Sequence, residues 1–209
     1  MRKGIIVNLK RVKILDYVTL NKIFIALCGI FILGIALGTT VLSKNNFLSQ
    51  NAEHLINNYI ELHNGNLFFK KLLLCSLKYF AIIILYFLSG TSMLGVAVTP
   101  FITLWQGIIF GCITSYIYST HGLNGIAFNA IILIPSSIFF IMCCFFAAKY
   151  AINFSLAIAK LTLPQSKASS LYMQFKDYCI KYLIFAAMSL ICSTLEIILN
   201  LLFLKFFNF

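Results

Sequence analysis

Long runs of apolar residues, separated by shorter polar segments, divide most of this chain into five blocks. A helix needs about 20 apolar residues to cross the roughly 30 Å hydrocarbon layer of a bilayer. A helix on the surface of a soluble protein would carry a polar stripe at helical spacing, and these runs carry none. The pattern therefore predicts five transmembrane helices, over Ile23–Leu42, Leu72–Leu88, Met93–Ser119, Gly125–Ala148 and Tyr178–Phe203.

The composition of the chain agrees with this prediction. Of the 209 residues, 61% are hydrophobic and 10% are charged, which lies outside the usual range for a soluble domain. This length accommodates one helical bundle and no separate folded domain. We expect residues 1–22 to form a basic arm and residues 23–209 to form a single transmembrane domain. The predicted fold class is an all-α, polytopic membrane helix bundle.

Basic residues gather on alternate connections between the predicted helices. The formal net charge of +11 would suggest nucleic-acid binding in a soluble protein, but here eleven basic residues fall on one side of the membrane and four on the other. The larger group is Arg2, Lys3, Lys10, Arg11, Lys13, Lys22, Lys149, Lys160, Lys167, Lys176 and Lys181; the smaller is Lys44, Lys70, Lys71 and Lys205. Cytoplasmic loops carry the excess of positive charge, so the N-terminus is predicted to be cytoplasmic and the C-terminus extracytoplasmic. We expect the basic residues to contact anionic lipids, and we expect no nucleic-acid partner.

The segment 43–66 is the one long connection on the predicted outer side. Between Leu48 and Leu62 its apolar residues recur at helical spacing, and His63-Asn64-Gly65 then provides a helix stop. The pattern predicts an amphipathic extracytoplasmic helix. Two interpretations remain open: the helix rests on the membrane interface or the bundle, or it is a docking surface for an extracytoplasmic partner.

Two ionisable residues lie deep in predicted spans, Lys78 in the second and Glu196 in the fifth. With a rise of 1.5 Å per residue, Lys78 would lie about 9 Å and Glu196 about 12 Å below the outer surface. Because an unpaired charge at this depth is costly, we hypothesise an ion pair that joins the two helices. The main alternative is that Lys78 extends outwards alone while Glu196 is protonated. A proton pathway is a third interpretation, although no second acidic residue lies within a span.

Small residues recur at helical spacing in two of the predicted spans. These are Gly34-x-x-x-Gly38 in the first span and Gly107-x-x-x-Gly111 in the third. Glycines at this spacing let another helix backbone approach closely. They serve either packing within this bundle or contact with a second membrane protein.

Prolines predict irregular points in the third and fourth helices. Pro100 and Pro135 each remove a backbone donor, and we expect the helices to bend there. A short outer loop, Thr120–Asn124, is expected between these helices. The fourth helix is expected to continue to about Lys160 before the segment that contains Pro164 interrupts it.

Motifs of catalysis and of metal binding are missing from the sequence. It contains no H-E-x-x-H pair, no G-x-S-x-G elbow and no Walker A loop, and its three histidines fall outside the predicted spans. The seven cysteines lie in or beside apolar runs without C-x-x-C spacing, which favours a packing role. We therefore expect no enzymatic activity, no metal and no cofactor.

Several short motifs in the third and fourth spans resemble the stage II sporulation protein M family. They are S-G-T-S-M-L-G-V-A-V-T-P (Ser89–Pro100), Q-G-I-I-F-G (Gln106–Gly111), H-G-L-N-G (His121–Gly125), I-L-I-P-S-S (Ile132–Ser137) and N-F-S (Asn153–Ser155). The basic N-terminal arm, the five predicted spans and the length also fit, so the resemblance covers most of the chain.

The resemblance implies a non-enzymatic membrane scaffold that acts when a mother cell engulfs its forespore. Such proteins look like anchors, in the mother-cell membrane at the sporulation septum, for two peptidoglycan-degrading partners, the stage II sporulation proteins D and P. Their complex is expected to thin the septal wall and drive membrane migration. A docking surface is then expected on the outer helix and the following outer loop, with Glu53, Tyr59, Glu61 and His121 as candidate residues.

A transport protein is the rival class, either the membrane subunit of an exporter or a small-solute permease. The predicted bends at Pro100 and Pro135 favour it, because broken helices line the substrate sites of transporters. The lack of an inverted repeat and the scarcity of polar residues in the spans argue against it.

The five-span topology predicts that the two termini lie in different compartments. A green fluorescent protein fusion should be fluorescent at the N-terminus, and an alkaline phosphatase fusion should be active at the C-terminus. A second phosphatase fusion within residues 45–67 should also be active. The same reporter active at both termini, either fluorescent protein or phosphatase, would place both termini in one compartment and contradict the odd number of crossings.

Overall fold

The computed structural model describes residues 22–44, 68–161 and 169–203. The helices are α2 (Lys22–Lys44), α4 (Phe68–Thr91), α5 (Gly95–Phe128), a short π-helix η1 (Asn129–Leu133), α6 (Ile134–Leu161) and α7 (Ser169–Phe203). Five of them are long and apolar enough to cross a membrane, and the described ranges contain no strand. The prediction of an all-α bundle with five membrane spans is confirmed.

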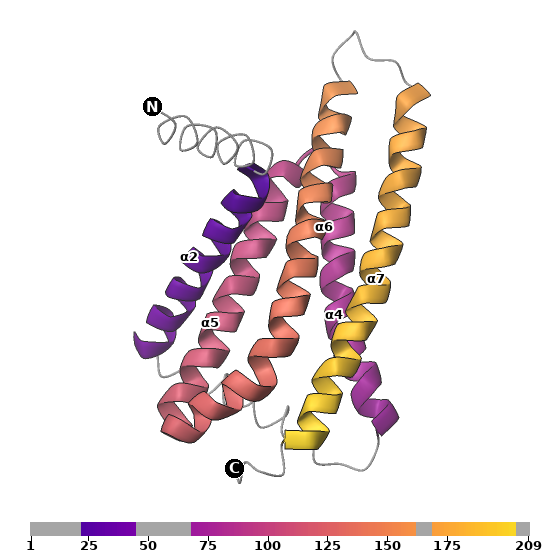
Figure 1. The fold of residues 1–209 in the computed structure, drawn as a ribbon. Helices are drawn as coiled ribbons and strands as arrows, with labels where there is room; N and C mark the ends of the chain where they lie inside the picture. The colour runs from indigo at the N-terminus through magenta and orange to yellow at the C-terminus, as the bar shows by residue number, and fades with distance from the viewer. Residues whose placement is uncertain (1–21, 45–67, 162–168, 204–209) are drawn as a thin grey trace, which may run out of the picture.

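The five long helices run alternately up and down in one bundle (Figure 1). Helices α4, α6 and α7 contact one another, whereas α2 packs mainly along α5. The described part of the chain starts at Lys22 and finishes at Phe203 at opposite ends of the bundle, as an odd number of spans requires. We call these the Lys22 end, predicted to be cytoplasmic, and the Gly122 end, predicted to be outer, where the chain reverses near the end of α5.

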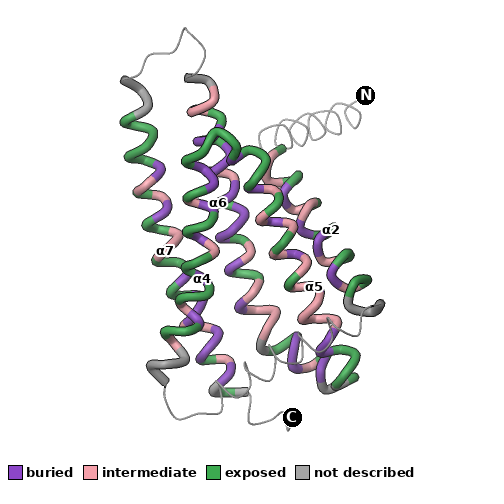
Figure 2. Tube along the Cα trace, turned by 180° about the vertical axis from the view of Figure 1, so that it is seen from behind, coloured by how far each residue is buried: buried purple, intermediate pink, exposed green. Residues whose placement is uncertain are grey.

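Many large apolar side chains face outwards, while several small polar side chains lie inside the bundle. Ile32 and Phe101 are 64% and 66% exposed, whereas Thr99, Thr103 and Ser155 are fully buried. Exposed residues follow the outer faces of the helices in Figure 2. This arrangement suits a lipid environment, in which helices associate through close packing and hydrogen bonds.

Glycines bring α2 and α5 into backbone contact. A Cβ atom added at Gly34 would lie 2.5 Å from the carbonyl oxygen of Leu104 and 3.0 Å from the Cα atom of Gly107. One added at Gly38 would meet the carbonyl oxygen of Ile108 more closely still. Only glycine, which has no Cβ atom, permits the backbones of α2 and α5 to approach this closely.

The second glycine pair of α5 continues the same contact. A Cβ atom at Gly111 would collide with the carbonyl oxygen of Ile35, and the thiol of Cys112 donates to the carbonyl oxygen of Gly38 at 3.3 Å. The structure thus places the two small-residue motifs face to face, which favours packing within the bundle over contact with another membrane protein.

Helix α5 is interrupted at a single residue inside its bounds, Gly122, where the chain begins to reverse. Gly122 has φ +52° and ψ −127°, a backbone conformation that glycine adopts readily and other residues rarely do. The predicted loop Thr120–Asn124 is therefore wrong in its extent, because helical backbone continues on both sides of Gly122.

Pro100 lies in the second turn of α5, where it removes the hydrogen bond to the carbonyl of Val96.

A π-helix stands immediately before Pro135. Because proline has no N–H group, the carbonyl of Ile131 loses its usual helical donor. The backbone widens instead, and the N–H of Ile134 bonds the carbonyl of Asn129, five residues back. The hydroxyl of Ser136 donates to the carbonyl of Leu133 at 3.2 Å. The irregularity expected at Pro135 takes this form, and α6 then continues to Leu161, as predicted.

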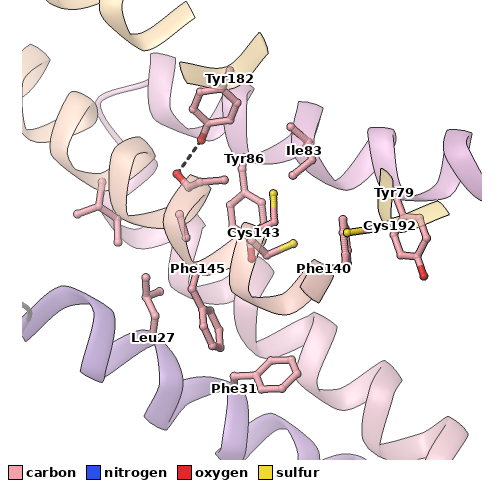
Figure 3. Packing of buried hydrophobic residues seen from close by; sticks show 14 of the residues in the cluster. Leu27, Phe31, Tyr79, Ile83, Tyr86, Phe140, Cys143, Phe145, Tyr182 and Cys192 are labelled. Carbon is pink, nitrogen blue, oxygen red and sulfur yellow. Dashed lines mark hydrogen bonds between the residues drawn. The ribbon is translucent and has the colours of Figure 1, made fainter. Parts of the chain in front are cut away.

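Aromatic side chains fill the centre of the bundle. Phe145 of α6 points towards Leu27 and Phe31 of α2, and its ring lies 5.6 Å from that of Phe31 (Figure 3). The hydroxyl of Tyr182 donates to the carbonyl of Ala147 at 2.8 Å, which ties α7 to α6. These contacts fix the helices around the region described next.

Alanine at Gly38 should destabilise the protein by about 1–3 kcal/mol, because its methyl group would push α2 away from α5. Gly29, on the same helix, is the matched control: an added Cβ atom there meets nothing within 4 Å. Gly29→Ala should be neutral or stabilise the helix by up to about 1 kcal/mol. Unfolding of the purified variants in detergent by increasing SDS measures both effects. Equal stability of the two variants would contradict a backbone contact at Gly38.

Candidate functional site: an intramembrane cavity

A cavity of about 420 Å³ lies inside the bundle, between residues of α2, α4, α5, η1, α6 and α7. Its walls are mostly aliphatic and aromatic, with a few polar side chains among them. The polar residues are Lys78, Tyr79, Gln106, Thr114, Ser137 and Glu196. Volume and lining both match those of small-molecule binding sites, in which apolar walls surround a few converging polar groups.

Three of the residues that line the cavity have exposed side chains. They are Lys78 and Ala81 of α4 and Ile109 of α5. All three lie within the candidate membrane spans Leu72–Thr91 and Gly95–Thr120. The cavity is therefore at the level of the candidate spans.

Glu196 is the buried acidic group of this cavity. It is 2% exposed, and the hydroxyl of Tyr79 donates to its Oε2 atom at 2.5 Å. The Nζ atom of Lys78 lies 5.5 Å from the centroid of the same tyrosine ring. The structure thus brings Lys78 and Glu196 to one cavity, on helices distant in sequence, while their direct ion pair stays a prediction.

Tyr79 was not among the sequence candidates, although its position carried a recognisable feature. A tyrosine in the middle of a span needs a hydrogen-bond partner for its hydroxyl, and Glu196 is that partner. Cys75, Tyr79, Ile83 and Tyr86 form one buried stripe on α4, spaced by three or four residues. That stripe could have been recognised as the inward face of the helix.

Pairs of hydrogen-bonded hydroxyl groups lie between α4 and α5, from the cavity towards the Lys22 end. The hydroxyl of Tyr86 donates to Oε1 of the lining residue Gln106 at 3.2 Å and lies 3.0 Å from the hydroxyl of Thr103. Further along, the hydroxyls of Ser89 and Thr99 lie 3.0 Å apart. These contacts join α4 to α5 wherever small side chains leave room for them.

Two side-chain hydroxyl groups, from α6 and α7, donate hydrogen bonds to backbone carbonyls beside the tight turn between α4 and α5. The hydroxyl of Ser155 donates to the carbonyl of Ser92 at 2.8 Å, and that of Tyr178 donates to the carbonyl of Phe87 at 2.8 Å. An added Cβ atom at Gly90 would collide with the hydroxyl of Tyr178. The small residues of the S-G-T-S-M-L-G motif therefore make space for side chains from α6 and α7, which the sequence alone did not indicate.

The predicted docking residues lie mostly outside the described residues. These are Glu53, Tyr59 and Glu61, and the side chain of His121 is likewise outside. The described neighbourhood of His121 does include exposed apolar side chains, since Leu123 is 84% and Ile126 46% exposed.

The described side chains show no arrangement for holding a metal ion. Within residues 22–44, 68–161 and 169–203, no three His, Cys, Asp or Glu side chains gather at a common point. All seven cysteines are free thiols, and Cys143 and Cys144 are buried among the central aromatic rings.

Comparison with known proteins gave one family. The sequence model of the family described as "Stage II sporulation protein M" matches residues 26–198, from the first turns of α2 to the last turns of α7. No curated protein and no solved structure matches the chain.

Removing the phenolic hydroxyl with Tyr79→Phe should lower the free energy of unfolding by about 0.5–3 kcal/mol, because the hydrogen bond to the buried carboxyl group of Glu196 is lost. In the Tyr79→Phe background, the decrease in the free energy of unfolding caused by Glu196→Gln should be smaller than in the wild type by at least about 0.5 kcal/mol.

The matched control for this cycle is Tyr182→Phe, which removes a buried hydroxyl that bonds Ala147 instead. Its effect should add to that of Glu196→Gln within about 0.5 kcal/mol. SDS unfolding of the purified variants measures both cycles, and additivity of Tyr79→Phe with Glu196→Gln would count against the interaction.

Proposed function

Because the chain belongs to the stage II sporulation protein M family, we propose that it is a membrane scaffold which anchors peptidoglycan-degrading enzymes during forespore engulfment. The chain is a sporulation-related, multi-pass membrane protein. Its proposed partners are the stage II sporulation proteins D and P, and its proposed location is the mother-cell membrane at the septum. The family match across all five spans carries this proposal.

The packing of the bundle supports a role as a rigid anchor. Backbone contact along α2 and α5, and hydroxyl bonds among α4, α5, α6 and α7, leave little freedom for the helices to slide. An anchor must hold its partners at a fixed place on the membrane while they cut the wall. Closely packed spans meet that requirement.

Partner docking is proposed at the Gly122 end. Helix α2 finishes at this end, at Lys44, and α4 begins there, at Phe68 (Figure 1). The reversal at Gly122, with the exposed side chains of Leu123 and Ile126, lies at the same end.

A permease is the second candidate, and the intramembrane cavity is the observation that favours it. A transporter must expose its substrate site to water on each side of the membrane in turn. The lining of this cavity is mostly apolar and offers few polar groups to bind a solute, which favours the scaffold over the permease.

Combined replacement of Glu53, Tyr59 and Glu61 by Gln, Ala and Gln should reduce recovery of the two partner hydrolases at least about tenfold, if these residues include interface hot spots. Affinity purification of the tagged chain from membranes in mild detergent, followed by mass spectrometry, measures the recovery. The matched control is Asp177→Asn, an exposed acidic residue of α7 towards the Lys22 end.

Undiminished recovery by the triple variant would remove this docking surface from consideration. Failure of the wild-type chain to recover either hydrolase would overturn the scaffold itself.

A further inference from the structure

Helices α6 and α7 extend beyond the other helices at the Lys22 end (Figure 1). A Cβ atom added at Gly90, in the last turn of α4, would lie 2.9 Å from the Cα atom of Ala151, so these two residues are at one level. Helix α6 continues for ten residues past that level, from Ala151 to Leu161, which is about 15 Å of helix. Helix α7 accompanies it, because the rings of Tyr178 and Phe154 stack with their centroids 4.4 Å apart.

The level of Gly90 is close to the boundary of the hydrocarbon layer. The candidate span of α4, Leu72–Thr91, has 20 residues, and a helix of this length covers the roughly 30 Å of that layer. The headgroup region adds about 5–7 Å on each side. Exposed aromatic side chains beyond this level, Phe175 and Tyr172, are typical of a membrane interface. The part of α6 and α7 just past Gly90 therefore lies among the lipid headgroups.

A groove of about 170 Å³ lies between α6 and α7 at this level. Its lining includes Tyr150 and Asn153 of α6 and Gln174 and Lys181 of α7. The Nζ atom of Lys181 lies 4.3 Å from the centroid of the Tyr150 ring, a cation–π contact that holds the ammonium group at the groove. The side chains of Asn153 and Gln174 are exposed, and each carries an amide with two N–H donors. The groove therefore offers one ammonium group and two side-chain amides to a ligand.

Positive charge exceeds negative charge around this groove. Asp177 is the acidic residue of the lining, and its side chain is exposed. Against this one carboxylate stand three lysines: Lys181 lines the groove, and Lys149 and Lys176 each precede a lining residue in the chain. The excess of positive charge favours an anion as the ligand, and the carboxylate of Asp177 weakens its binding without reversing the preference.

We propose that this groove binds the phosphate group of an anionic phospholipid, in the leaflet at the Lys22 end, with Lys181 as the principal ligand. Lysine binds phosphate as a point charge through three donors, and the amides of Asn153 and Gln174 donate to the remaining phosphate oxygens. Basic pockets between membrane helices bind anionic headgroups in this way. A lipid is favoured over a soluble phosphate because the groove lies at headgroup level and includes the apolar side chains of Phe154 and Ala157.

Native mass spectrometry of the full-length chain in mild detergent tests the proposal. The protein is equilibrated with equal amounts of palmitoyl-oleoyl phosphatidylglycerol, phosphatidylethanolamine and phosphatidylcholine. We expect the wild type to retain phosphatidylglycerol about tenfold over phosphatidylcholine, and Lys181→Met should abolish this preference, because a charge-assisted hydrogen bond is lost. The matched control is Lys22→Met, which removes an exposed lysine at the same end of the bundle that does not line the groove. It should retain phosphatidylglycerol like the wild type.

A second variant should change retention in the opposite direction. Asp177→Asn removes the one negative charge of the lining and should raise the retention of phosphatidylglycerol by about two- to fivefold. A headgroup that placed its own ammonium group at Asp177 would respond with a loss instead. Tyr150→Leu should lower retention, because the ammonium group of Lys181 loses the aromatic ring, whereas Tyr150→Phe keeps the ring and should behave like the wild type.

Three results would overturn the proposal. One is equal retention of phosphatidylglycerol and phosphatidylcholine by the wild type, or equal retention of phosphatidylglycerol by Lys181→Met and Lys22→Met. Another is preferred retention of phosphatidylethanolamine that Asp177→Asn reduces, which indicates a zwitterionic headgroup. The third is full displacement of the lipid by an equal concentration of glycerol 3-phosphate, which indicates a soluble phosphate ligand. None of these measurements involves the hydrolases, so their outcome is independent of the scaffold proposal.

Discussion

Backbone contact between α2 and α5 is the interaction on which the arrangement of this bundle depends. Lipid gives helices no hydrophobic reason to associate, so close packing and hydrogen bonds must hold them together. At Gly34 and Gly38 the two backbones approach so closely that no side chain fits between them. This contact holds α2 in place, and from there Phe31 reaches the central aromatic cluster and one wall of the cavity.

The same constraint explains where polar residues are found. The hydroxyl groups of Ser155 and Tyr178, for example, donate to backbone carbonyl groups beside the turn between α4 and α5. Polar side chains here act as links between helices, and they need small neighbours such as Gly90. Glu196 differs because it is buried and lines a cavity, where the hydroxyl of Tyr79 donates to it.

The proposed scaffold role requires closely packed spans and a surface outside the membrane. Backbone contact between α2 and α5 provides the close packing, and the proposed docking surface at the Gly122 end would provide the surface. The family match runs from α2 to α7 and so includes all five spans.

The sequence by itself determined the five spans, because a run of about 20 apolar residues has few alternatives to crossing a bilayer. It also identified Gly34, Gly38, Lys78 and Glu196 as positions of interest, since small or charged residues stand out in apolar runs. Only the tertiary structure decided which helices meet at them. Pairing between helices depends on side chains distant in sequence, so the bond from Tyr79 to Glu196 could not be predicted from either helix alone. The sequence predicted a reversal over Thr120–Asn124, and the structure decided that it occurs at Gly122, the one residue there whose backbone angles are not helical.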